Sequence, residues 1–151
     1  MVIAVGLHIL AVVVWVGGMF FAHTALRPAV GPLEPPQRLP LLERTLGRFF
    51  QWVWASVVVL LLSGYWMILI ELGGFAAVGV HIHIMQGIGI VMMLIFLHVY
   101  FAPFRRLRAS VAAEDWPAAG AAIGLIRQMV AINLVLGLVT AVVGATGRYW
   151  G

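Results

Sequence analysis

The 151-residue chain is 64% hydrophobic and only 9% charged, and its mean hydropathy is +1.09. Soluble domains average about 25% charged residues, so too few polar side chains remain here to coat a core, and a lipid bilayer must be part of the solvent. The net charge of +4 does not indicate nucleic-acid binding, because all nine basic residues are arginines that lie mostly between apolar segments and form no basic face.

Four apolar segments without charge follow one another along the chain. A helix needs about 20 such residues to cross a bilayer. The predicted transmembrane helices cover about residues 2–26, 50–71, 79–104 and 126–147. The first carries His8, Trp15 and His23 and lacks the basic start and cleavage site of a signal peptide, so we expect it to be retained. The sequence therefore predicts one all-α domain over 1–151, an integral membrane four-helix bundle with up-down-up-down connections.

The arginines of the connecting segments predict how the bundle is oriented. Segments 27–48 and 105–127 each hold four of the nine arginines, whereas the segment around Glu71 and Gly73 holds none. Cytoplasmic loops of membrane proteins are enriched in basic residues. Both arginine-rich loops are therefore predicted to be cytoplasmic, and both termini to lie on the outer, periplasmic side of the inner (plasma) membrane.

Local signals predict helix starts inside the two arginine-rich segments. The first segment is broken by several prolines and is expected to resume as a short amphipathic helix from about Pro40. Asp115 directly precedes Trp116 and Pro117, which is typical of an N-cap followed by proline in the first turn. The fourth helix is therefore expected to start there and to enter the membrane after Arg127.

All five histidines lie in or beside the first and third predicted helices, which run in the same direction and would face each other diagonally across the bundle. His8 and His23 are 15 residues apart, and so are His83 and His98. If His8 and His83 lie at the same depth in the bundle, His23 and His98 must therefore also share one depth, which gives two levels. At 1.5 Å per residue the two levels lie about 22 Å apart. His81 would point away from His83, towards headgroups or the loop.

Two imidazoles at each level would supply both axial ligands of a low-spin haem iron. The chain has no cysteine, so a haem could not be attached covalently. This pattern predicts two b-type haems per chain; a single haem, another metal or no cofactor stay open as alternatives. The predicted ligand pairs are His8 with His83 and His23 with His98, and the predicted propionate contacts are Arg27, Arg105 and Arg148.

Several short runs resemble CopD-like membrane proteins, the copper-resistance D family, and the resemblance covers essentially the whole chain. They are Leu7-His8-Ile9-Leu10, Trp15-Val16-Gly17-Gly18-Met19-Phe20-Phe21, Ala25-Leu26-Arg27-Pro28, the pair His81 and His83, and the tract from Met92 to Arg106 with His98. The resemblance implies copper handling. The architecture also resembles transmembrane b-type cytochromes, and the opening is similar to that of HemJ-like protoporphyrinogen oxidases.

Two functions therefore compete. The first is a dihaem cytochrome, a haem-dependent oxidoreductase that carries electrons across the membrane to or from quinone, a small oxidant or a partner protein. The second is copper binding or transport, because thioethers and imidazoles suit Cu(I). Its candidate ligands are the histidines with Met19, Met67, Met85, Met92 and Met93, although no methionine ladder follows one helix face. A structural subunit is a third reading, and a homodimer stays open.

Overall fold

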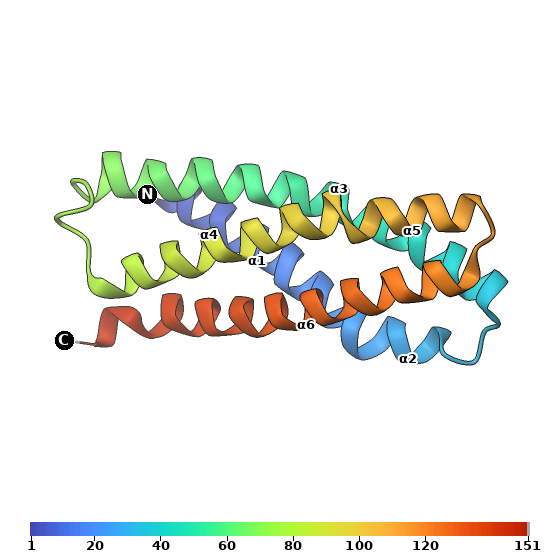
Figure 1. Cartoon of the computed structure of the whole chain (residues 1–151). Helices are drawn as coiled ribbons and strands as arrows, with labels where there is room; N and C mark the ends of the chain where they lie inside the picture. The colour runs from blue at the N-terminus through green and yellow to red at the C-terminus, as the bar shows by residue number, and fades with distance from the viewer. Residues whose placement is uncertain (151) are drawn as a thin grey trace.

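The computed structural model describes residues 1–150, and all regular structure in that range is helical. Four apolar helical segments are long enough to cross a membrane: Val2–Val30, Pro35–Glu71, Val80–Ala112 and Trp116–Tyr149. Figure 1 shows them lying along one another as an elongated bundle, with consecutive long segments running in opposite directions. The prediction of an all-α protein with four membrane-spanning helices is confirmed.

Six α-helices, two short π-helical turns and one 3-10 turn build these segments. The α-helices are α1 (Val2–Phe21), α2 (Arg27–Val30), α3 (Pro35–Trp66), α4 (Val80–Phe101), α5 (Pro103–Ala112) and α6 (Trp116–Thr146). The π-helical turns η1 (Ala22–Leu26) and η2 (Met67–Glu71) extend α1 and α3, and the 3-10 turn η3 (Gly147–Tyr149) extends α6. The helices therefore continue well beyond the charge-free segments at the arginine-rich end.

The helix boundaries follow from proline and from a capping carboxylate. Asp115 accepts a hydrogen bond from the backbone N–H of Ala118 at 3.1 Å, so the predicted N-cap of α6 is confirmed. The amphipathic helix expected from Pro40 is not separate: α3 begins at Pro35, because prolines are tolerated in a first turn where their missing N–H groups have no helical partner. Pro103 forces Ala102 out of helical geometry, and this break separates α4 from α5.

An aromatic cluster fixes α3 against α4 and α5 in the middle of the bundle. The ring centroids of Phe50 and Phe104 are 4.9 Å apart, and those of Trp54 and Phe96 are 5.2 Å apart. Phe50 and Phe96 are almost completely buried. Edge-to-face pairs of this kind stabilise a packed arrangement beyond the burial of their area, so the cluster sets the rotation of α4 about its own axis.

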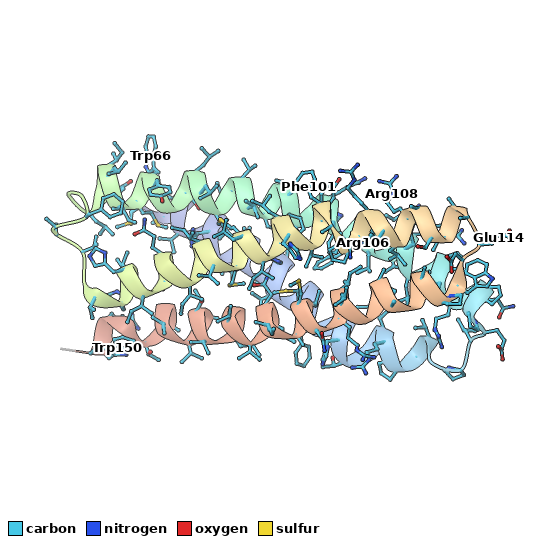
Figure 2. All side chains as sticks on the ribbon, viewed as in Figure 1. Trp66, Phe101, Arg106, Arg108, Glu114 and Trp150 are labelled. Carbon is cyan, nitrogen blue, oxygen red and sulfur yellow. The ribbon has the colours of Figure 1, made fainter. Side chains whose placement is uncertain are left out.

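Charged and aromatic side chains separate along the bundle. Both termini lie at one end, and the turns that follow α2 and α5 lie at the other (Figure 1). Trp66 and Trp150 lie near the end with the termini, whereas Arg106, Arg108 and Glu114 lie in the opposite half (Figure 2). The two arginine-rich segments therefore share one end of the molecule, as the positive-inside rule requires of loops on one side of a membrane.

We predict that compartment reporters inserted near Pro36 or Ala112 will report the cytoplasm, and that a reporter between Gly73 and Gly74 will report the outer compartment. The reason is the eight arginines on two loops and their absence from the third. The measurement compares an enzyme that is active only outside the cytoplasm with a fluorescent protein that matures only inside it. The inverse pattern would reverse the predicted orientation.

Candidate functional site

His8 on α1 is held by α3 in a defined tautomer. Its Nδ1 lies 2.9 Å from the Ser63 hydroxyl oxygen, and that hydroxyl donates its hydrogen to the Val59 carbonyl at 2.6 Å. A hydroxyl has only one hydrogen to donate, so the Ser63 oxygen must accept from His8 Nδ1–H. The lone pair of the neutral ring then lies on Nε2. Such orientation of one ring nitrogen by a second residue is typical of metal-ligating histidines.

The side of α4 that faces α6 carries three soft donors. His81 packs its ring on Gly147, and its centroid lies 6.3 Å from the ring of Trp150. Further along α4, a Cβ at Gly144 would lie 3.2 Å from the sulfur of Met85. A Cβ at Gly137 would lie 3.1 Å from the terminal methyl of Met92. We call this contact the α4–α6 seam: His81, Met85 and Met92 of α4 against Gly144 and Gly137 of α6 and Gly147 at the start of η3.

Glycine makes the seam possible. Without Cβ atoms on α6, the α4 side chains lie directly on its backbone, as small residues allow at helix contacts in membranes. An alanine at Gly144 would force the flexible end of Met85 to move, and one at Gly147 would meet the carbons of the His81 ring. The three glycines are spaced so that they fall on one side of α6, which gives the seam its length.

His83 and His98 lie on the opposite side of α4 and are exposed, together with Val91 and Leu94. The expectation that His83 faces inward and His81 outward is therefore reversed. The cause is the aromatic cluster, because burying Phe96 also turns every residue on its side of α4 inward, and His81 is one of them. Rotating His83 inward would expose Phe96.

The remaining predicted site residues lie at the ends of the bundle. His23 is half-buried in the π-helical turn η1, a distortion that often accompanies functional sites. Arg27 and Arg105 are exposed, and Arg148 stacks on the Tyr149 ring with its guanidinium carbon 4.6 Å from the centroid. No hydrogen bond within residues 1–150 joins two histidines, so the pairing of histidines around haem stays a prediction.

Carboxylate and imidazole groups alone do not build a metal centre in this fold. Among residues 1–150, no three side chains of His, Asp or Glu converge on one point, and the chain has no cysteine. A metal centre with three or more side-chain ligands would therefore include a ligand of another kind, such as methionine sulfur or amide oxygen.

Two residues in the middle of the bundle, Met129 and Asn133 of α6, are not among the site residues predicted from the sequence. Both line a small internal cavity, and Asn133 is only 3% exposed. A signal was present, because Asn133 is the single asparagine of the chain and lies inside the fourth apolar segment. Polar groups at membrane depth are costly and usually functional.

These features define a multi-pass helical membrane protein with imidazole, thioether and amide donors between its helices. Residues 43–146 match the family model described as Copper resistance protein D, and the chain belongs to this CopD family of inner-membrane proteins. No curated protein and no solved structure matches it significantly. The matched segment includes all of α4 and α6, and therefore the seam except Gly147, whereas α1 with His8 and His23 lies outside it.

We predict that His8 is neutral with its hydrogen on Nδ1, and that Ser63→Ala will shift it towards the other tautomer. Alanine removes the acceptor that now holds Nδ1–H, while the small change in volume leaves α3 packed. Nitrogen-15 chemical shifts of labelled histidine in the lipid-reconstituted protein distinguish the two tautomers. Ser56→Ala is the matched control, because Ser56 is equally buried on α3 and has no bond to His8. Equal spectra for the parent and Ser63→Ala would contradict the assignment.

Proposed function

We propose that this CopD-family protein binds copper as Cu(I) and conducts it along the α4–α6 seam. One observation supports this function above the others: three soft donors from one side of α4 lie against three glycines of the last helical segment, two on α6 and one on η3. Thioether ligands select Cu(I) and imidazole also binds copper, whereas hard divalent cations prefer carboxylates, and no carboxylate lies in the seam. The family description of copper resistance points in the same direction.

Neutral donors in a row suit passage better than storage. Conduction requires sites that bind strongly enough to admit an ion and weakly enough to release it to the next. His81 and Met85 are four residues apart, about 6 Å along the helix, and Met92 follows after about 10.5 Å. Methionine has a long flexible side chain with a polarisable sulfur, so successive thioethers can reach towards one another across these steps.

We predict that Met85→Leu will lower Cu(I) transport about tenfold while leaving the fold intact. Leucine keeps the apolar volume of methionine at small cost to stability, but it removes one soft ligand, a change of the size seen when a metal site is weakened. The measurement is Cu(I) uptake by proteoliposomes under reducing conditions. Met93→Leu is the matched control: Met93 adjoins the seam residue Met92 but points to another side of α4. Equal losses in both variants, or no loss in Met85→Leu, would contradict transport along the seam.

A b-type cytochrome is the second candidate function, and the free Nε2 of His8 favours it. In that function His8 would pair with His83, and His23 with His98. The residues present do not fit two haems in this arrangement, because His83 and His98 are exposed on the side of α4 that faces away from α6. The haem proposal therefore requires α4 to turn its other side inward, at the expense of the buried Phe96.

We predict that protein purified from cells supplied with both haem and copper will retain copper and show no reduced haem b band. The reason is that soft donors are already assembled in the seam, whereas the histidine pairs are not. The measurement combines absorption spectra of the oxidised and dithionite-reduced protein with elemental analysis. A red protein with about two haems per chain, whose spectrum is lost in both His8→Ala and His83→Ala, would replace copper handling with the cytochrome.

A further inference from the structure

All four long helical segments meet around a small cavity deep in the bundle. Its volume is about 10 Å³, and all the side chains that line it are apolar except the amide of Asn133 on α6; they include Trp15 and the thioether-bearing Met19 and Met129. We call these four residues and the cavity they line the central chamber. Met19 is 2% exposed and Trp15 is 3% exposed, so these two lining side chains are shielded from the lipid.

One polar atom of the chamber wall has no partner. The Asn133 amide nitrogen donates to the Met92 carbonyl at 3.2 Å. Its Oδ1 is the single buried side-chain oxygen or nitrogen within residues 1–150 that has no hydrogen bond. The two ends of the amide cannot be exchanged, because a carbonyl oxygen accepts hydrogen bonds and would repel Oδ1. An acceptor therefore stays unpaired in the core.

The position of Asn133 along α6 makes this unpaired acceptor expensive. Asn133 lies six residues beyond Arg127, about 9 Å along the helix and within the charge-free segment. Asn133 is only 3% exposed, and a buried polar group without a partner loses the full free energy of its hydration. A leucine would fill the same space without that loss. A ligand bound to the amide oxygen would compensate for its lost hydration.

The chemistry of the chamber selects among ligands that fit such a volume. A buried water normally makes two to four hydrogen bonds, whereas the chamber offers one strong acceptor and two thioethers, which accept only weakly. A hard dication would keep most of its charge unbalanced, since the chamber holds no carboxylate. A soft monovalent cation is attracted by the amide oxygen and both sulfurs, and the electron-rich indole adds to this attraction.

We infer that the central chamber is a binding site for a soft monovalent cation of the Cu(I) class, held by Asn133 Oδ1 with the thioethers of Met19 and Met129. The physiological cargo of this site rests on the proposed copper function. Met92 connects the two sites, because its side chain lies in the seam on Gly137 while its carbonyl fixes the Asn133 amide. The chamber is then the next cation-binding site after the seam.

The test uses Ag(I), a redox-inert probe of the same class, with the full chain in lipid nanodiscs. Bound silver is measured per chain by equilibrium dialysis and elemental analysis. The parent is expected to bind about two Ag(I) ions, one in the seam and one in the chamber. Asn133→Leu, Met19→Leu and Met129→Leu should each lose one of the two, or weaken it about tenfold. Gln86→Leu is the control, because its amide also lies within a membrane span but donates to Tyr65 at 3.1 Å.

Thermal unfolding separates loss of a site from loss of the fold. Asn133→Leu removes an unpaired polar atom, so it should unfold at the same temperature as the parent or higher without silver, and silver should protect it less. If Asn133→Leu binds Ag(I) as the parent does while Met85→Leu loses one ion, the chamber inference is overturned and the seam stands. If only the Asn133 variant loses an ion, the chamber stands without the seam. A parent that binds no Ag(I) overturns both.

Discussion

The contact between α4 and the glycines of α6 determines much of the structure. Helices in a bilayer gain little from hiding apolar surface, since lipid is equally apolar, so close packing must hold them together. Gly137, Gly144 and Gly147 permit that packing. Together with the burial of Phe96, the contact fixes which side of α4 faces the protein. That single rotation decides whether His81 or His83 is available inside the bundle, and therefore which chemistry the bundle can support.

The sequence was sufficient for features that depend on local or one-dimensional signals. Hydropathy located four spans, the positions of arginine grouped two loops at one end, and Asp115 identified the start of α6. The rotation of α4 could not be predicted in the same way. The polar residues of α4, its three histidines with Gln86 and Tyr100, lie on more than one side of the helix, so no single polar stripe marks the side that faces the protein. The matched spacing of the histidines is compatible with either rotation, and only the aromatic contacts between helices distinguish them.

The candidate site escaped the sequence for a related reason. A methionine ladder would show as short, regular spacing along one helix, whereas the methionines of the central chamber come from α1 and α6. Long-range convergence of this kind leaves no local pattern. No sequence signal predicts the π-helical turn that contains His23. That turn breaks the regular α-helical repeat from which the position of His23 relative to His8 was predicted. The parts of the site that residue spacing could not predict are therefore those formed by residues far apart in the sequence.

The distribution of polar atoms agrees with a path for a cation. A bilayer protein of this composition satisfies most buried polar groups locally: Ser63 bonds to its own helix and to His8, and Gln86 to Tyr65. Asn133 is the exception, because its Oδ1 has no hydrogen-bond partner at the point where α1, α3, α4 and α6 converge. Neutral ligands replace part of the hydration shell of a cation but do not neutralise its charge. They therefore offset part of the cost of dehydration without binding the cation as tightly as a carboxylate would. An unpaired amide oxygen in a cavity that Met19 and Met129 also line suits that balance, whereas a purely structural asparagine would gain nothing from leaving its oxygen unbonded.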